Sequence, residues 1–400
     1  MGQMDPHEKI WIVKYMEKKK AEKAAAQEAA GGGAAVATAD APRRGIAGKI
    51  DFINSLSPED RKHYLTDAFL NNALYILMAI FIIVTAFVNK NFVSASSIAN
   101  ILTLAAASLP MALGIAGCIV LTGTDLSGGR VFGLTAAMAA AFLQNRMATK
   151  LIFEHMPNTT GAWIFAVLIL VMLVGAIVGL VNGFFVAKFS LHPFIVTLAT
   201  QLITYGIILM FFQINGNGGG PIGNIAQEFK NAVSGPAIQI SAWSVSIPWY
   251  VIYAIVLVGV MWFIWNKTTF GKNMFAVGSN AEAARVSGVN VFWTTVLVHT
   301  LAGAMYGFAG FVEAARLGSI TAATGLNNEC DAIAACVIGG VSFVGGTGKI
   351  SGIVVGVFVL RIIFVALNML GINPNLQFII KGAIILAACS LDMRKYLARK

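Results

Sequence analysis

Long apolar runs separated by short polar stretches dominate the chain from Phe69 to its last few residues. A helix that crosses a bilayer needs about 20 consecutive, mostly apolar residues. Such runs predict spans near residues 69–88, 98–122, 130–144, 161–187, 193–213, 248–266, 294–316, 331–344, 350–370 and 376–391. The fold class that follows is an all-α polytopic membrane protein with about ten transmembrane helices, in a range of about eight to ten.

Two of these runs, 130–144 and 331–344, are too short for comfortable spans, and each is flanked by glycines. Non-helical backbone at membrane depth is tolerated only where protein or a water-filled cavity satisfies its polar groups. We therefore expect these two runs to form broken or re-entrant segments inside the helix bundle.

A polar segment precedes the first run. Residues 1–68 mix Lys, Glu and Ala, as in KYMEKKKAEKAAAQEAA, and then break at GGG and APRRG. The segment lacks the apolar core and small-residue cleavage site of a signal peptide. We expect a polar N-terminal tail with a Gly/Ala-rich linker over 1–68, and a transmembrane domain over 69–395.

Composition supports a membrane protein, because 57% of the residues are hydrophobic and only 12% are charged, against about 25% charged in soluble domains. A net charge of +10 in a soluble protein would suggest nucleic-acid binding. Here the basic residues cluster in the tail, in the loop 266–291 and in RKYLARK at the C-terminus. The positive-inside rule then places both termini and this loop in the cytoplasm, and the Gly-rich loop 214–247 outside. We expect the lipid bilayer, and not nucleic acid, as the partner of this surface.

The sequence carries no pattern expected for a bound metal or nucleotide. Its four cysteines form no CxxC pair and no Cys/His spacing suited to zinc. The segment GGTGKIS is not a phosphate loop, because the Walker pattern requires glycine and Ser or Thr where this chain has Phe343 and Ile350. We expect no metal site, no cofactor bound by this chain and no catalytic residues, so the chain is not an enzyme.

One polar turn between two apolar runs offers candidate chemistry at membrane depth. The motif GTDLSGGR brings together Thr124, Asp125, Ser127, Gly128 and Gly129. A polar solute must exchange water for fixed polar groups, and apolar spans offer few of them. These residues are therefore candidates for the translocation path or gate of a neutral solute. A structural turn in which Asp125 caps the next helix is an equally good interpretation.

Further ionisable residues fall within the apolar half of the chain. An ionised side chain at membrane depth is costly unless it is paired or hydrated. Most of these residues lie near span ends, where long side chains can extend to the interface. We interpret them in that way: Arg130, Glu313, Arg316, Asp331, Arg361 and Lys381.

Four longer motifs make the sequence resemble a known family. They are TGTDLSGGR, WNKTTFGKNMFAVGSNAEAARVSGVN, EAARLGSITAATGLNNECDAIAACVIGGVSFVGGTG and GINPNLQFIIKGAIILAACSLD. Together they are similar to permease subunits of bacterial galactose/methyl-galactoside ABC importers, within the wider ribose/xylose-type sugar permease family. The resemblance covers about residues 69–395, and the Lys/Ala/Glu tail departs from the family pattern.

The resemblance implies a multi-pass permease subunit of the bacterial cytoplasmic (inner) membrane. In that family two permease copies, here a homodimer, form a pathway. A cytoplasmic ATPase with tandem nucleotide-binding halves drives it, and an external sugar-binding protein delivers a monosaccharide. The resemblance favours galactose, glucose or methyl-galactoside, with a ribose- or xylose-type permease as the alternative.

The resemblance also gives the polar loop 266–291 a role as the loop that couples the permease to its ATPase. Asn280 would cap a short helix whose small apolar face docks in an ATPase groove. The residues we assign to this contact are Asn280, Glu282, Ala283, Ala284, Arg285 and Gly288. An ordinary cytoplasmic linker is the alternative.

Two other classes of membrane protein stay open. A secondary transporter driven by an ion gradient would need a carboxylate-rich site near the middle of the membrane, for which Asp125 alone is thin support. A passive channel would not need the coupling loop. Dependence of uptake on a separate ATPase distinguishes all three classes.

Overall fold

The computed structural model describes residues 57–58, 61–62, 76, 79–148, 150–243 and 245–397. The chain divides into two compact units, Met1–Asp67 and Ala68–Lys400. The expected N-terminal tail lies almost wholly outside the described residues, as does the first half of the span expected at 69–88. The second unit is described below.

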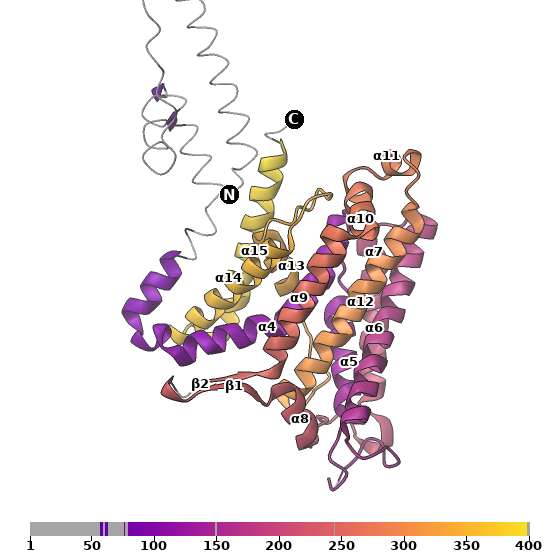
Figure 1. Ribbon diagram of the computed structural model, residues 1–400, viewed down its shortest axis with the longest axis vertical. Helices are drawn as coiled ribbons and strands as arrows, with labels where there is room; N and C mark the ends of the chain where they lie inside the picture. Colours follow the sequence, from indigo (N-terminus) through magenta and orange to yellow (C-terminus); the bar gives the residue numbers. More distant parts are fainter. Residues whose placement is uncertain are drawn as a thin grey trace, which may run out of the picture. The chain divides into compact units, whose positions relative to one another are not determined.

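Helices make up most of the second unit (Figure 1). They are α4 (Ala95–Val120), α5 (Gly128–Phe142), α6 (Gly161–Phe189), α7 (Pro193–Phe211), α8 (Gln227–Ser234), α9 (Trp249–Lys267), α10 (Thr269–Ser279), α11 (Ala281–Val286), α12 (Val291–Leu317), α13 (Asn328–Ile338), α14 (Ile350–Met369) and α15 (Pro374–Leu397). Two short strands, β1 (Pro236–Ile240) and β2 (Val245–Pro248), pair antiparallel as a hairpin.

Six of the described helices, α4, α6, α7, α9, α12 and α14, are long and apolar enough to cross a membrane. Shorter apolar helices cover Ala79–Val88, Gly128–Phe142 and Asn375–Ala387. The all-α polytopic fold class is thus confirmed, whereas a full count of ten spans stays a prediction.

The two runs that we expected to be broken segments form the shortest helices of the bundle interior. α5 has 15 residues and α13 has 11, so at about 1.5 Å per residue neither crosses a hydrocarbon core of about 30 Å. Most residues of both helices are buried. They are short helices packed within the bundle.

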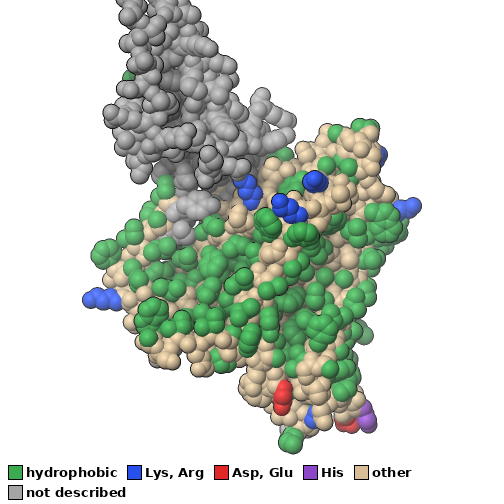
Figure 2. Space-filling model, viewed as in Figure 1, with side chains coloured by type: hydrophobic (Ala, Val, Ile, Leu, Met, Phe, Trp, Pro, Cys, Tyr) green, Lys and Arg blue, Asp and Glu red, His purple; other side chains and the backbone are tan. Residues whose placement is uncertain are grey.

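Burial separates central from peripheral helices. In α4 and α12, 78% and 72% of the most apolar window is buried, against 22% in each of α6 and α7. On the face shown in Figure 2, apolar side chains are spread over the middle of the bundle, between its two polar ends. α4 and α12 therefore form the core, and α6 and α7 present an apolar face suited to lipid.

Glycines allow α12 and α6 to approach backbone to backbone. A Cβ on Gly303 would overlap the carbonyl oxygen of Gly175, and a Cβ on Gly179 would overlap that of His299. Small residues at such spacing are the usual basis of close helix packing in membranes. This packing fixes α12, which carries several of the polar residues discussed below.

The polar loops of the two ends are well separated. Figure 1 shows α10, α11 and the C-terminal end of α15 at one end of the bundle, and α8 with the β1–β2 hairpin at the other. Lys and Arg side chains gather near α10 and α11, whereas the acidic side chains visible in Figure 2 lie at the opposite end. The arrangement agrees with the expected separation of loops 266–291 and 214–247. Their assignment to the cytoplasm and to the outside stays a prediction.

Candidate functional site

The turn before α5 buries its two central polar side chains. The side chains of Asp125 and Ser127 are both fully buried. Oδ1 of Asp125 accepts hydrogen bonds from the backbone N–H of Ser127 at 2.9 Å and from its hydroxyl at 2.6 Å. The hydroxyl of Tyr306, on α12, donates to Oδ2 of Asp125 at 3.1 Å. The carboxylate thus ties the turn before α5 to the central helix.

Further hydrogen bonds extend this network to α6 and α7. The side-chain amide of Asn182 donates to Oγ of Ser127 at 2.9 Å. The Thr200 hydroxyl in turn donates to Oδ1 of Asn182 at 2.6 Å. The Thr197 hydroxyl donates to the backbone carbonyl of Thr124 at 3.2 Å. Buried networks in which every member is satisfied rigidify a core.

The glycines after this turn are packing positions. A Cβ on Gly128 would lie 3.1 Å from the ring of Tyr306, and a Cβ on Gly129 would overlap the carboxylate of Glu329. Both glycines lie within α5. Their environment, like that of Asp125, favours a structural turn over a place in a translocation path, which stays a prediction. The expected cap is wrong in its residue, because Ser127 and not Asp125 is the N-cap of α5.

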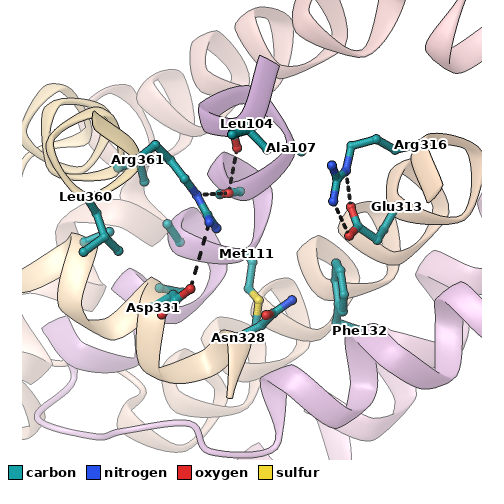
Figure 3. Close-up of a pocket in the computed structure, with 15 residues that line it drawn as sticks. Leu104, Ala107, Met111, Phe132, Glu313, Arg316, Asn328, Asp331, Leu360 and Arg361 are labelled. Atoms are coloured by element: carbon teal, nitrogen blue, oxygen red, sulfur yellow. Dashed lines mark hydrogen bonds and ion pairs between the residues drawn. The ribbon is translucent and has the colours of Figure 1, made fainter. Parts of the chain in front are cut away.

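A polar cavity lies elsewhere, between α4, α5, α12, α13 and α14 (Figure 3). The space open to the centres of water molecules is about 120 Å³, and about 10–15 Å³ of such space holds one water. The cavity is thus large enough for several waters or a small polar solute. Ser108, Glu313, Arg316, Asp331 and Arg361 line it.

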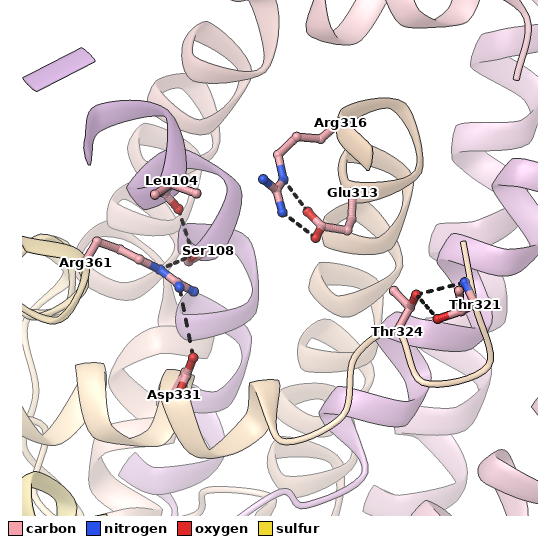
Figure 4. Close-up of polar contacts among 8 residues, drawn as sticks. All are labelled: Leu104, Ser108, Glu313, Arg316, Thr321, Thr324, Asp331 and Arg361. Carbon is pink, nitrogen blue, oxygen red and sulfur yellow. Dashed lines mark hydrogen bonds and ion pairs between the residues drawn. The ribbon is translucent and has the colours of Figure 1, made fainter. Parts of the chain in front are cut away.

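Two sets of paired charges face this cavity (Figure 4). Arg316 binds Glu313 with two hydrogen bonds of 2.6 Å, one from Nε and one from a terminal nitrogen. Arg361 lies 4.0 Å from Oδ2 of Asp331 and donates from Nε to the hydroxyl of Ser108 at 2.8 Å. The five side chains come from α4, α12, α13 and α14, which are four of the five helices that line the cavity.

A third cation completes the second set. Nζ of Lys381, on α15, lies 3.0 Å from Oδ1 of Asp331 and 4.3 Å from the centroid of the Phe364 ring. The two ion pairs of this carboxylate, together with the cation–π contact of one of the cations, compensate much of the free-energy cost of removing these charges from water.

The sequence revealed these charges but not their role. The structure corrects their interpretation as side chains that extend to the membrane interface. The residues that pair inside the protein are Glu313, Arg316, Asp331, Arg361 and Lys381. Arg130 is only 8% exposed and lies over the ring of Tyr205. The i,i+3 spacing of Glu313 and Arg316 was the available signal. The pairing of Asp331 with Arg361 and Lys381 depends on tertiary contacts between α13, α14 and α15.

The short helix expected in loop 266–291 is confirmed as α11. Oδ1 of Asn280 accepts a hydrogen bond from the backbone N–H of Ala283 at 2.9 Å, as an N-cap does. Gly288 adopts a φ of +84°, and its N–H donates to the carbonyl of Arg285. The left-handed conformation at this position ends the helix.

The exposed face of α11 differs from the one that we expected. Glu282, Ala283 and Arg285 are exposed, and the ion pair between Glu282 and Arg285 spans 3.4 Å in solvent. Ala284, however, is only 4% exposed, so it does not lie on the exposed face of α11, and its assignment to the ATPase contact stays a prediction. Val286 is 86% exposed, and the sequence analysis missed it.

Comparisons with known proteins agree on a class of membrane permeases. A family described as "Branched-chain amino acid transport system / permease component" matches residues 97–389. The galactose/methyl galactoside import permease protein MglC of Escherichia coli K12 is 40% identical over 345 residues, which is 86% of this chain and 100% of that protein. The ribose import permease protein RbsC of Bacillus subtilis is 30% identical over 316 residues, 79% of this chain and 90% of that protein. No solved structure is significantly similar to the chain.

Proposed function

The chain belongs to the family of import permeases that includes the galactose/methyl galactoside and ribose permeases, and we propose that it carries galactose or a closely related hexose into a bacterial cell. In this proposal it is the transmembrane subunit of an ABC importer, located in the inner membrane. The observation that carries the proposal is the 40% identity to the galactose/methyl galactoside permease along 86% of the chain. Ribose and xylose are less favoured, since the ribose permease is 30% identical.

The polar cavity supports a neutral, hydroxyl-rich substrate. Its charges are paired with one another, so they offer hydrogen-bond donors and acceptors without a large uncompensated charge. Sugar hydroxyls can replace water at such groups. A branched-chain amino acid, which the family description mentions, would find apolar contacts here as well, since Leu104, Met111 and Leu360 also line the cavity. It would, however, need free charges for its ammonium and carboxylate groups, and the charges of the cavity are paired with one another. We therefore propose this cavity as part of the sugar route.

The same charges argue against a transporter driven by an ion gradient. A coupling-ion site that uses a carboxylate needs one that is free to bind the ion, although backbone carbonyls can also coordinate it. The two carboxylates that line the cavity, Glu313 and Asp331, are each occupied by basic side chains. ATP hydrolysed by a separate subunit is the energy source in our proposal.

We propose that α11 docks on that ATPase through its exposed face. Glu282, Ala283, Arg285 and Val286 form this face, with Asn280 and Gly288 fixing the two ends of the helix. An exposed valine rimmed by an acid and a base matches the pattern of an apolar contact with a polar edge. A second copy of the permease and an external sugar-binding protein at the α8 end complete the assembly that we propose.

Reconstitution into liposomes tests the function. The permease is combined with its tandem ATPase and sugar-binding protein, and uptake of radiolabelled galactose is measured with and without ATP. We expect ATP-dependent uptake that excess glucose inhibits and that excess ribose or leucine does not. Collapse of the proton and sodium gradients is expected to leave uptake unchanged. Uptake that follows an ion gradient without ATP, or uptake of leucine in place of galactose, would overturn the proposal.

A further inference from the structure

Three backbone segments meet at the C-terminal end of α10, just before α11 begins. They are the C-terminal end of α4, the last turn of α10, and the loop 339–349 between α13 and α14. The N–H of Gly346 donates to the carbonyl of Val120 at 2.9 Å. Gly278, in α10, lies against the same carbonyl so closely that a Cβ there would overlap its oxygen.

Glycines keep side chains out of this junction. A Cβ on Gly345 would overlap the side chain of Thr122 and lie 2.5 Å from the carbonyl oxygen of Gly278. A Cβ on Gly346 would lie 2.8 Å from Cα of Ser279. Gly345 and Gly346 also have φ values of +87° and +66°, a conformation that glycine adopts without strain. The three segments therefore touch main chain to main chain at Gly278 and Gly346, and the methyl group of Thr122 fills the space beside Gly345.

Each segment continues into an element already assigned a role. α10 leads through Asn280 into α11, the proposed ATPase-docking helix. Val120 ends α4, which contributes Ser108 to the cavity. The loop 339–349 joins α13 and α14, which carry the cavity residues Asp331 and Arg361. The junction is thus the point where the docking side of the permease contacts three elements that line the cavity.

We propose that Gly278, Gly345 and Gly346 are positioning residues that transmit movement of α10 and α11 to the cavity. The inference rests on the proposed function, since it assumes that ATP-driven movement reaches α11. Packed backbone resists compression, so a displacement of α10 moves the end of α4 and the loop 339–349 with it. A displaced α4, α13 and α14 would change how Ser108, Asp331 and Arg361 face one another.

The first test separates coupling from folding with two glycine substitutions. Gly278→Ala places a methyl group against the Val120 carbonyl and should push α10 away from α4. Gly259→Ala is the matched control, because a Cβ at Gly259 in α9 meets no atom within 4 Å. In the complete reconstituted complex, Gly278→Ala is expected to retain the ATPase but to lower galactose uptake per ATP hydrolysed by about tenfold. Gly259→Ala is expected to match the wild type in both measurements.

The second test loosens the junction in a variant that should fold normally. Thr122 has a φ of +62° and packs its methyl group beside Gly345. Thr122→Gly suits this φ and removes the contact, so we expect wild-type yield, retained ATPase and again reduced uptake per ATP. If Gly278→Ala does not reach the membrane, the uptake per ATP of Thr122→Gly alone tests the inference.

The outcomes distinguish this inference from the function on which it rests. Wild-type uptake per ATP in every variant that folds would overturn the inference and leave the sugar importer intact. A wild-type complex that takes up no galactose with ATP would overturn the proposed function itself. Loss of uptake in exact proportion to loss of folded permease would show that the glycines serve folding only, and would also overturn the inference.

Discussion

Two aspartates lie at membrane depth in this protein, in opposite surroundings. Asp125 is fully buried, and its oxygens accept hydrogen bonds from Ser127 and Tyr306. Among the described residues it forms no ion pair. Asp331 faces a cavity and is held by Arg361 and Lys381.

The difference shows that polarity at membrane depth does not by itself identify a path for a solute. A carboxylate whose hydrogen-bond partners are all within the protein stabilises one arrangement of helices. A carboxylate that faces a cavity, with its charge balanced, still offers hydrogen bonds to something that enters. In our proposal the sugar route therefore passes near Asp331, and Asp125 has a structural role.

The largest expected effect comes from Asp331→Ala. Removal of this carboxylate leaves Arg361 and Lys381 without a counter-charge, and breaking such a buried pair typically costs about 3–5 kcal/mol. We expect galactose uptake to fall about a hundredfold or more, with a lower yield of folded permease. Gly259→Ala, at a position of α9 where a Cβ meets no atom within 4 Å, is the control and should leave uptake unchanged.

A double substitution separates the two consequences of losing Asp331. Asp331→Asn combined with Lys381→Gln removes one negative and one positive charge together, so it should recover much of the yield. Uptake should stay low, because the donor and acceptor pattern of the cavity has changed. Recovery of both yield and uptake would place the sugar route elsewhere.

Asp125→Ala should mainly destabilise the permease. It removes the acceptor for the buried N–H and hydroxyl of Ser127, and an unsatisfied buried donor costs about 1–3 kcal/mol. We expect a lower thermal midpoint in detergent, and uptake per folded molecule close to that of the wild type. Tyr306→Phe, which removes one of the three hydrogen bonds to Asp125, should show a smaller shift. Loss of uptake without a change in stability would indicate that Asp125 belongs to the sugar translocation path.

The contrast between enclosed and exposed positions extends to α11. Ala284 is enclosed, so Ala284→Trp should overpack its site, which typically costs about 1–3 kcal/mol, and should lower stability before it affects docking. Val286→Glu should instead weaken the contact with the ATPase and leave insertion and stability unchanged. Thermal unfolding and co-purification of the ATPase measure the two effects. If Ala284→Trp instead released the ATPase without lowering stability, and Val286→Glu retained it, Ala284 would belong to the docking face.

The smallest effect is expected for Arg285→Glu. The side chains of Arg285 and Glu282 are 64% and 75% exposed, and exposed ion pairs contribute at most about 1 kcal/mol. The stability of the permease should not change measurably. Affinity for the ATPase should fall modestly at low salt and return towards the wild-type value as salt screens the reversed charge. An effect independent of salt would exclude an electrostatic contact.

The sequence predicted the positions of the helices well, because apolar runs of this length report directly on membrane burial. The run at 161–187 corresponds to α6 (Gly161–Phe189), and the run at 294–316 to α12 (Val291–Leu317). The cap at Asn280 was also predictable, since a capping side chain acts on residues only a few positions away.

The predictions that the structure corrects concern contacts between residues that are far apart in the sequence. Tyr306, the α12 partner of Asp125, is 181 positions away, so burial of that aspartate left no local signal. Lys381 donates a hydrogen bond to Asp331 although the two residues are 50 positions apart in the sequence. In α11 small residues occur on more than one side of a six-residue helix, and composition could not show that Ala284 faces inward. Side-chain direction in so short a helix depends on what packs against it.

Accessibility of single cysteines tests the assignment of the sugar route most directly. In a permease whose native cysteines are replaced by serine, Asn328→Cys places a thiol in the cavity and Ser127→Cys places one in the enclosed network. The complete complex in liposomes is treated with a small, charged thiol reagent, with and without galactose, during ATP turnover. We predict that Asn328→Cys is labelled and that galactose slows its labelling, whereas Ser127→Cys is not labelled. Labelling of Ser127→Cys that galactose slows, with Asn328→Cys unreactive, would contradict the account.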